Sequence, residues 1–522
     1  MKKFWILILT LTILFAAAVS AGAEFSDEPQ LPDKNRTAID YAVGKGIISG
    51  FPDKSFRPSS TLTRAQAAKI LCVALEGGEK ANAVAAAETG FADVPATHWA
   101  SGCVAYCAEK RIVAGVGSGR FNPDGKLSSA AFAKMLLVAY GHDPEAEGLV
   151  GENWIENTDK ALKASGCDEG IKQVSSGQLS RGSACQLVCN FVRRAEEKEL
   201  AEMGYPFETF PLNEKQNFRV LGRSVLTDEA LLCDFAASGV EFTLDCAGTL
   251  WVTLDTPAES GIRVRAFVDG KRGEALTFSP KLKTQPLFCG IAPGVHTIRI
   301  LKDTQADNLE NKLISFSVSA KKDTIKATEQ KRRYIEFIGD SITSGCGLYG
   351  AGAEGVSTYS AGPSYGVQTA DLLDADFALI SRGGIGLQQK AGPGGSCTSD
   401  VLYDYQNYYR DKETKFDFAR KPDVVVIALG TNDKKTETYY DQMKAFIGQV
   451  RARYQDTSLK IILMHNMMTD RYTETFEKIA SEDPYCWQLK VPQDRNGHSH
   501  HPTAEGHTQY AQLLSEFIKT IL

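Results

Sequence analysis

The sequence predicts a multidomain chain in which α-helical repeats precede an all-β sandwich and an α/β region with a mostly parallel sheet. Three observations predict this order. Paired helical segments recur within residues 24–198, alternating apolar and polar runs fill residues 217–325, and apolar strands alternate with helical segments over residues 330–522. A length of 522 residues also exceeds what one hydrophobic core organises, so about three domains are expected.

The first 23 residues have the pattern of a secretory signal peptide. Lys2 and Lys3 precede an apolar run over residues 4–19, and Ala-Gly-Ala at residues 21–23 is a small-residue cleavage pattern. The run is shorter than a permanent membrane span requires, so a retained anchor is the less favoured alternative. We therefore expect a secreted mature chain that begins near residue 24 and has no membrane span.

The charge pattern argues against a nucleic-acid partner. The formal net charge of −6 falls to −8 when Lys2 and Lys3 leave with the signal peptide. Acidic and basic residues are interspersed, which is typical of an ordinary solvated surface rather than a basic binding face.

Twelve cysteines are scattered through apolar patterns. Cys103 and Cys107, like Cys185 and Cys189, lie one turn apart on predicted helices. Because no further ligands lie nearby in the sequence, small buried side chains are favoured over zinc ligands or a disulfide framework, although the pairing of the cysteines stays open. We expect no metal and no cofactor.

An internal repeat organises residues 24–198. The segment "AIDYAVGKGIISGFPDKSFRPSSTLTRAQAAKIL" is echoed from Trp99, and a weaker third copy runs from Trp154 to about Arg193. Each copy has an amphipathic helix, a turn and a second helix with a Ser or Thr cap. The pattern resembles three tandem S-layer homology modules at about 30–76, 88–142 and 150–194, with "TRAQ" at 63–66 similar to the signature of that family. A helical repeat with only a packing role is the alternative.

This resemblance implies attachment of the protein to the bacterial cell wall through an anionic polysaccharide, of a kind that is often pyruvylated. Arg64 and Arg181 begin the second helix of the first and third copies, where free backbone N–H groups beside an arginine would suit an anion. The second copy has Ser129 at this position, so whether its pocket binds stays open.

The residue pattern changes after the repeats. Residues 199–216 are predicted to be a charged linker, and residues 217–325 an antiparallel sandwich, because short alternating runs such as "GIRVRAFVDGKR" are separated by Asp-Gly and Pro-Gly turns. From residue 330 the apolar runs "RYIEFIGD", "FALISRGG", "PDVVVIALGTND" and "LKIILMHNM" alternate with helical segments, which indicates a parallel sheet. Ligands of such sheets bind at the carboxyl ends of the strands.

Four elements with chemical potential lie at these strand ends or near the C-terminus. Ser341 in "FIGDSITSGCG" follows the first strand, and a helix is expected to begin just after it. The glycines of "SRGGIGL" permit close backbone approach to a ligand, and Asn432 of "ALGTND" is a side-chain amide at a strand end. "GHSHHPTAEGH" holds four of the eight histidines. Taken singly, each has an ordinary alternative: a cap, a turn, or a zinc cluster.

Together, and in this order, the four elements resemble the SGNH, or GDSL-like, hydrolase superfamily, which implies a flavodoxin-like three-layer α/β/α fold. With the sandwich included, the roughly 300 residues after Asn217 resemble carbohydrate esterase family 2, whose members pair a jelly-roll domain with this catalytic fold. The segments "VLGRS" at 220–224 and "GVHTIRILKDT" at 294–304 add to the resemblance. It implies an acetyl xylan esterase type of activity, which removes acetyl groups from sugar hydroxyls, notably at the 6-position.

The resemblance also implies roles for individual residues. Ser341 matches the nucleophile and His501 the general base, and the oxyanion donors would be the N–H groups of Ser341 and Gly384 and the Asn432 amide, with Gly383 as the alternative glycine. A neutral imidazole can take the serine proton and return it to the leaving sugar oxygen, so no metal is required.

The sequence departs from the superfamily pattern before His501. The usual aspartate two or three residues earlier is replaced by Ser499 and His498, although family 2 includes enzymes in which a backbone carbonyl orients the imidazole. Asp494 is a candidate substitute acid, and His507 is an alternative base that is more typical of packing at a helix start.

Three further side chains have less direct roles in this interpretation. Trp487 is a candidate stacking platform for a sugar ring, with core packing as the equal alternative. Asp340 and Asp433 are expected to brace loops rather than to carry out chemistry. Competing functions are a non-catalytic glycan-binding protein and a lipase-like or thioesterase activity on the same fold. Which acetylated polymer is used, plant glycan or the cell's own wall, stays open.

Overall fold

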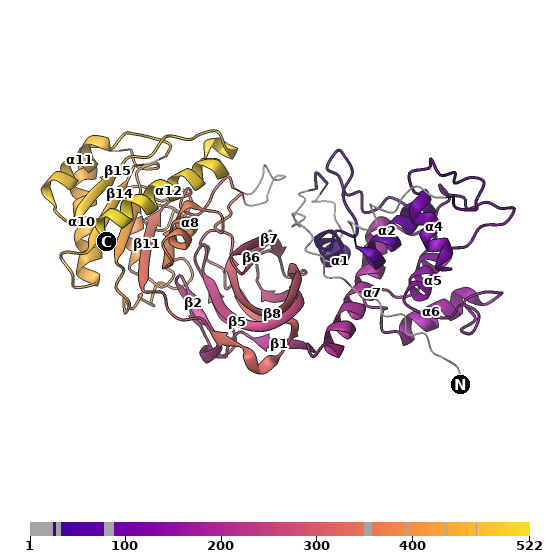
Figure 1. The fold of residues 1–522 in the computed structure, drawn as a ribbon. Coiled ribbons are helices and arrows are strands. Elements are labelled where there is room, and N and C mark those ends of the chain that lie inside the picture. Colours follow the sequence, from indigo (N-terminus) through magenta and orange to yellow (C-terminus); the bar gives the residue numbers. More distant parts are fainter. Residues whose placement is uncertain are drawn as a thin grey trace.

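The computed structural model describes residues 25–27, 33–77, 88–348, 358–392, 395–434, 436–465 and 467–522, so the predicted signal peptide lies outside the described residues. Figure 1 shows three regions in a row: helical repeats, an antiparallel sheet in the middle, and an α/β region that ends at the C-terminus. We call them the repeat region (33–204), the β region (207–327) and the α/β region (333–522). Among the described helices, none combines the length and apolar character that crossing a membrane requires.

The repeat region consists of paired helices, as predicted. Its elements are α1 (Asp33–Gly44), α2 (Arg64–Glu76), α4 (Ser101–Glu109), α5 (Ser129–Ala139), α6 (Trp154–Ala164) and α7 (Arg181–Glu202). The second helix of each copy begins after a hydroxyl side chain that accepts from the third backbone N–H of the helix. The three caps are Thr63, Ser128 and Ser180. These local signals explain why all three helices begin where the sequence predicts.

The extended residues before these three helices meet around one axis. The Leu62 N–H donates to the Leu179 carbonyl at 2.9 Å, the Leu179 N–H to the Leu127 carbonyl at 2.8 Å, and the Leu127 N–H to the Leu62 carbonyl at 3.0 Å. Each copy therefore gives one hydrogen bond to a neighbour and takes one from the other, and the three hydrogen bonds form a closed ring.

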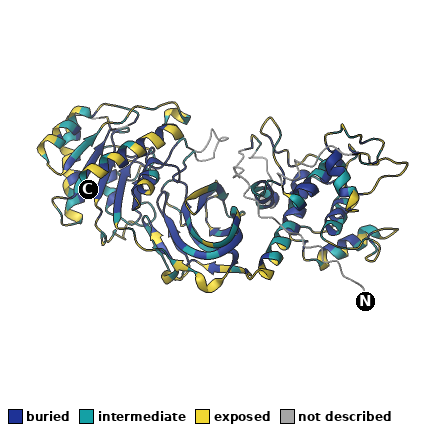
Figure 2. Cartoon of the chain, in the orientation of Figure 1, coloured by how far each residue is buried: buried dark blue, intermediate teal, exposed yellow. Residues whose placement is uncertain are grey.

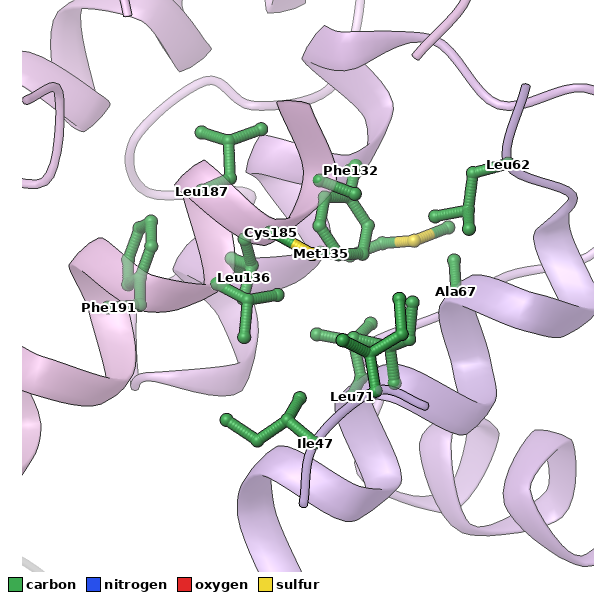
Figure 3. Close-up of a cluster of buried hydrophobic side chains, with 14 of the residues drawn as sticks. Ile47, Leu62, Ala67, Leu71, Phe132, Met135, Leu136, Cys185, Leu187 and Phe191 are labelled. Atoms are coloured by element: carbon green, nitrogen blue, oxygen red, sulfur yellow. The ribbon is translucent and has the colours of Figure 1, made fainter. Parts of the chain in front are cut away.

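Apolar side chains from all three copies share one core (Figure 3). Figure 3 shows Ile47 and Leu71 of the first copy and Leu136 of α5 extending toward one another, with Leu187 of α7 further up in the view. The cysteines that the sequence places on helix faces are buried in the same core as free thiols, which confirms their packing role. They are Cys103, Cys107, Cys185 and Cys189.

The β region is a ten-stranded antiparallel sheet in which β3-β4-β9-β5-β8-β6-β7 are successive neighbours. Its strands are β1 (Phe207–Pro211), β2 (Arg219–Leu221), β3 (Ser224–Leu226), β4 (Leu231–Cys233), β5 (Gly239–Asp255), β6 (Ile262–Val268), β7 (Lys271–Phe278), β8 (Thr284–Lys302), β9 (Lys312–Ala320) and β10 (Lys326–Ala327). The long strands β5 and β8 pair along most of their length with register shifts, and Figure 1 shows them curving around a buried interior. The jelly-roll arrangement stays a prediction.

One predicted boundary differs from the structure. Residues 199–216 are not a linker, because α7 continues to Glu202 and β1 pairs with β9. The charged sequence over 193–202 is the last part of a long helix, in which Glu196 pairs with Lys45 and Leu200 is buried. Only the turn around Gly204 separates that helix from the sheet.

The α/β region has a five-stranded parallel sheet in the order β12-β11-β13-β14-β15. The strands are β11 (Arg333–Gly339), β12 (Ala375–Ser381), β13 (Val424–Ala428), β14 (Lys460–Met464) and β15 (Cys486–Leu489). This is the flavodoxin-like strand order that the resemblance implied. The fifth strand was not expected, because it has only four residues.

Helices cover both faces of this sheet. They are α8 (Tyr365–Leu372), α9 (Ser399–Tyr403), α10 (Thr436–Arg453), α11 (Thr473–Glu482) and α12 (Ala504–Ile521). One core contains residues of α8 and α12, and another contains residues of α9, α10 and α11, so the sheet lies between two helical layers. Figure 2 shows buried residues concentrated in the strands and on the inward sides of these helices.

Candidate active site

Ser341 lies in a tight turn directly after β11. The predicted helix after Ser341 is wrong, because residues 340–348 form a run of turns and α8 begins only at Tyr365. The turn is held by the Asp340 carboxylate, which accepts from the Ile342 N–H at 3.0 Å, and by the Ser341 carbonyl, which accepts from the Cys346 N–H at 2.9 Å. The serine is therefore fixed by its own turn, at the carboxyl end of a central strand.

His501 precedes α12, and the structure brings it to Ser341 from 160 residues further along the chain. Its Nε2 lies 2.9 Å from the Ser341 Oγ, and its Nδ1 lies 3.1 Å from the Ser499 carbonyl oxygen. With Nδ1 protonated and donating to that carbonyl, Nε2 is left to accept the serine proton. A backbone carbonyl, and not a carboxylate, is therefore the partner of the His501 Nδ1.

An unusual backbone conformation aims this carbonyl. Ser499 has φ 53° and His500 has φ 61°, so two successive residues other than glycine are left-handed. This conformation costs about 1–2 kcal/mol per L-residue. The loop between Gly497 and His501 turns sharply as a result, and the Gly497 N–H donates back to the His501 carbonyl at 2.8 Å.

Asp494 does not orient the catalytic imidazole. One of its carboxylate oxygens accepts from the Thr503 N–H at 2.8 Å and the Thr503 hydroxyl at 2.6 Å, and the other accepts from the Asn496 N–H at 3.0 Å. These bonds brace the turn that leads into α12, where Thr503 is the N-cap. The prediction of a substitute acid is therefore corrected: Asp494 supports the loop that carries His501.

His507 is excluded as the base. It is fully buried, and its Nδ1 accepts from the Tyr365 N–H at 3.1 Å. Burial lowers the pKa of His507 to about 3, so the ring is neutral and joins α12 to α8.

The Cys346 thiol also lies beside the catalytic imidazole. A hydrogen bond with Cys346 is the largest cause that raises the pKa of His501 above 6.5, the Ser499 carbonyl adds to the rise, and burial acts in the opposite direction. The thiol lies 3.5 Å from the Thr358 hydroxyl. Its nearness to His501 was missed, although Cys346 lies in the same segment as Ser341.

The two glycines after β12 have different surroundings. The Gly383 N–H donates to the Gln305 side-chain oxygen at 2.9 Å. Gly384 is exposed with φ 79°, and no acceptor in the described residues meets its N–H. Of the two candidates, Gly384 is the glycine whose N–H is available to a ligand.

Asn432 lies in the loop after β13, and its amide nitrogen donates to the Ile385 carbonyl at 2.9 Å. The second N–H has only a long contact, 3.4 Å, with Asp340. Asp340 also accepts from the Thr431 hydroxyl at 2.5 Å, and burial raises the pKa of Asp340 to about 6 against the effect of that bond. Asn432 is thereby joined to both the serine turn and the glycine loop.

The two aspartates brace loops, as expected. The Asp433 carboxylate accepts from the backbone N–H groups of residues 387, 388 and 389 at 2.8 to 3.2 Å. A Cβ on Gly386 would overlap this carboxylate, so the close approach requires glycine there.

Trp487 does not reach the catalytic pair. It lies in edge strand β15 and pairs with Ile462, three strands away from β11. Three strand spacings correspond to roughly 14 Å. The half-buried ring belongs to the edge strand, so it does not contact a group bound directly at Ser341, and a role in stacking on a sugar ring stays a prediction.

The predicted polysaccharide-binding arginines join the repeats to one another. The Arg64 Nε donates to the Phe121 carbonyl at 2.8 Å, and the Arg181 Nε to the Phe56 carbonyl at 3.0 Å. The backbone N–H groups of Arg64 and Arg181 also donate to carbonyls of neighbouring copies. The prediction that these helix ends are free to bind an anion is therefore wrong. At the equivalent position of the second copy, the Ser129 hydroxyl donates to the Ser175 carbonyl at 3.1 Å.

Across the described ranges, no three His, Cys, Asp or Glu side chains are grouped so as to hold a metal ion. The histidines of the zinc alternative instead have separate contacts: His501 lies beside the Ser341 hydroxyl, and the buried His507 accepts from the Tyr365 N–H.

Family models match the chain in two parts. The S-layer homology domain matches residues 24–68 and 90–133, and the GDSL-like Lipase/Acylhydrolase family matches residues 337–509. The third repeat, from Trp154, lies outside these matches.

Known proteins resemble part of this chain. "Cellulase/esterase CelE" of Acetivibrio thermocellus is 32% identical over 237 residues, which cover 44% of this chain and 28% of that protein. "Acetylxylan esterase / glucomannan deacetylase" of Cellvibrio japonicus is 25% identical over 323 residues, covering 59% of this chain and 89% of that protein. The chain thus spans well under half of the first relative's length.

A solved structure resembles more than half of this chain. A family two carbohydrate esterase from Clostridium thermocellum, in complex with cellohexaose, has a TM-score of 0.50 and 26% identity, covering 58% of this chain and 98% of that one.

Proposed function

We propose that this chain, which carries S-layer homology domains and a GDSL-like acylhydrolase domain, is a cell-surface carbohydrate esterase that removes O-acetyl groups through Ser341 and His501. The observation that carries the proposal is the 2.9 Å contact between the His501 Nε2 and the Ser341 Oγ, with the other ring nitrogen held by a backbone carbonyl. Similarity to esterases of carbohydrate supports the substrate class.

In the first half of the reaction, His501 takes the Ser341 proton while the Oγ attacks the acetyl carbonyl. The tetrahedral oxyanion is stabilised by the N–H groups of Ser341 and Gly384 and by the Asn432 amide, and the loss of one such donor typically costs about 3–4 kcal/mol. As the carbon–oxygen bond to the sugar breaks, the imidazolium returns the proton to the sugar oxygen.

In the second half, His501 takes a proton from water, and the resulting hydroxide attacks the acetyl-enzyme. Acetate leaves, and the proton returns to the Ser341 Oγ. The imidazolium that forms twice is stabilised by the Ser499 carbonyl dipole rather than by a carboxylate. The acetylated position, the 6-hydroxyl of a hexose in the resemblance, is part of this proposal.

The repeats would hold the enzyme at the cell wall. We propose that the matched S-layer homology domains, and the third repeat with its equivalent ring contacts, attach the enzyme to an anionic cell-wall polysaccharide, pyruvylated or not. Since the N–H groups at the starts of α2 and α7 are used between copies, the polymer would contact other surfaces of the repeats. Cosedimentation with purified walls, before and after removal of the polysaccharide, tests attachment.

Acetate release from acetylated xylan, acetylated glucomannan and an aryl acetate tests the esterase. Wild type should turn over at least one of these, Ser341→Ala and His501→Ala should lose at least a thousandfold in kcat, and the exposed-serine control Ser481→Ala should match wild type. Equal rates for wild type and Ser341→Ala would refute the proposal. Sugar binding by calorimetry without acetate release would instead support a non-catalytic glycan-binding role, and faster cleavage of long-acyl esters would support a lipase-like one.

A further inference from the structure

The glycine loop after β12 is held by a residue of the β region. Gln305 lies in the connection between β8 and β9, and its side-chain oxygen accepts from the Gly383 N–H at 2.9 Å. A Cβ on Gly383 would also overlap the Tyr359 hydroxyl. Gly383 is therefore fixed from two sides by groups outside its own loop.

The two contacts on Gly383 restrict the direction of the next N–H. The Gly384 N–H belongs to the peptide group that follows Gly383, so its direction depends on the two backbone dihedral angles of Gly383. The Gln305 contact anchors the N–H on one side of these angles at 2.9 Å, and the close approach of the Tyr359 hydroxyl leaves Gly383 little room to move. Gly384 is exposed, and within the described chain its N–H meets no acceptor. A free, pre-oriented donor at a strand end is what a developing oxyanion requires.

The connection that carries Gln305 is itself firmly anchored. Asp303 is fully buried and accepts from Arg265, from the Ser360 hydroxyl at 2.7 Å and from the Gly362 N–H at 2.7 Å. On the other side of Gln305, Ala306 is buried in the core of the α/β region. The segment is thus bound to the catalytic side by a charged group and an apolar group, with Gln305 between them.

The β region also contacts residues 359–360, which lie beside the turn that carries Ser341. Arg263 donates to the Tyr359 carbonyl, and the Ser360 N–H donates to the Gly345 carbonyl at 2.9 Å. One wall of the active site is therefore built on residues of β6 and of the connection between β8 and β9.

We propose that Gln305 is a positioning residue of the oxyanion hole: by binding the Gly383 N–H, it aims the Gly384 N–H at the substrate carbonyl, so that the β region completes the active site. This inference rests on the proposed esterase function. It assigns to the β region a part in transition-state stabilisation, beyond support of the fold.

Two variants separate positioning from folding. Gln305→Met keeps the length and removes the acceptor, whereas Gln305→Glu keeps an acceptor oxygen. For Gln305→Met we expect kcat for an acetyl ester to fall roughly tenfold with KM within twofold, since the loss lies in the transition state. Asp371→Asn, which removes an ion pair with Arg299 elsewhere on the same interface, should leave kcat unchanged.

Amide hydrogen exchange at Gly383 supplies a readout that does not need activity. Loss of the acceptor in Gln305→Met should speed this exchange at least fivefold, and Gln305→Glu should restore the wild-type rate. If exchange at Gly383 is unchanged in Gln305→Met, or if kcat stays at the wild-type value while exchange rises, the positioning role is overturned.

The two proposals fail differently. An inactive wild type defeats the esterase function and with it the catalytic part of this inference, while exchange at Gly383 still shows whether Gln305 holds the loop. If Gln305→Met does not fold, the shorter Gln305→Asn is used, and the same outcomes of kcat and exchange decide. A fall in kcat with both effects reversed in Gln305→Glu supports the assignment.

Discussion

The β region contacts both of its neighbours, and the two contacts differ in chemistry. At the contact with the α/β region the charges are buried: Arg223 of the β region and Glu336 of β11 are both fully buried 3.8 Å apart, and Arg219 pairs with Asp376 of β12. Toward the repeats it presents an aromatic ring, Trp251, which stacks on Tyr41 of α1 at 5.4 Å.

The difference indicates different functions for the two contacts. Buried charges are stable only when every partner is in place, so they favour one relative orientation of the two regions. Arg223 donates to the Tyr403 carbonyl at 2.6 Å, and Glu336 accepts from three tyrosine hydroxyls. The Trp251 contact lies on the side of the β region that faces α1 and α7, and no active-site residue takes part in it. One contact fixes the β region against the region that carries the proposed active site, and the other joins the β region to the repeats.

The largest expected effect comes from breaking the charged contact. Arg223→Met keeps much of the volume but leaves Glu336 buried without a cation, which should lower the free energy of unfolding by about 3–5 kcal/mol. Denaturant unfolding followed by esterase activity measures this loss. Asp371→Asn, in a pair whose carboxylate is 44% exposed, should cost under about 1 kcal/mol, and equal losses for the two would contradict the distinction.

Breaking the aromatic contact should leave the chemistry unchanged. Trp251 is 5% exposed, so Trp251→Ala should cost about 3 kcal/mol through lost packing. Calorimetry should show a lowered transition for the repeats, while kcat on an acetyl ester stays within twofold of wild type. A tenfold fall in kcat would show that the attachment side also supports the active site.

The histidine loop allows a sharper test of the same comparison. Ser499→Val places a β-branched residue at φ 53°, which should cost about 1–2 kcal/mol and lower kcat by misaiming the carbonyl at His501. Ser499→Gly, which accepts this φ without strain, should keep wild-type kcat. Combined with Trp251→Ala, the Ser499→Val effect should be additive, because the two sites share no contact.

The smallest expected effect concerns pH. The contact with Cys346 raises the pKa of His501, and the base must be neutral, so activity should increase with pH through a value above 6.5. Cys346→Ala removes the main cause of the rise, so the acid limb of kcat/KM should move to lower pH by less than about one unit. A pH–rate profile measures the shift, and movement of the limb to higher pH would contradict the assignment. Trp251→Ala should leave the limb in place.

Sequence patterns predicted the order of regions, four of the five parallel strands, and the pairing of Ser341 with His501. The comparisons confirm the resemblance to S-layer homology domains and to GDSL-like hydrolases. These predictions succeed because apolar periodicity and strand-end motifs are local, and because parallel strands bring their carboxyl ends to one edge.

The missed features depend on partners that are distant in sequence. Gln305 has no catalytic signature, and its role follows only from its contact with Gly383 across two regions. Asp494 was assigned to His501 by proximity in sequence, but the left-handed turn at Ser499 supplies a carbonyl instead. The sequence predicts free backbone N–H groups beside Arg64, because it does not show that another copy supplies their acceptors.

The ring of Leu62, Leu127 and Leu179 limits how this protein can evolve. In an open solenoid each copy contacts only the next one, so duplication can lengthen the array. Here every donor and acceptor of the ring is used, and the third copy bonds back to the first, so a fourth copy has no edge to join. The loss of one copy would leave an unpaired N–H and an unpaired carbonyl on the other two. Gain or loss of a single copy would therefore disrupt the ring of hydrogen bonds. We expect changes in wall attachment to come from substitutions within the three copies.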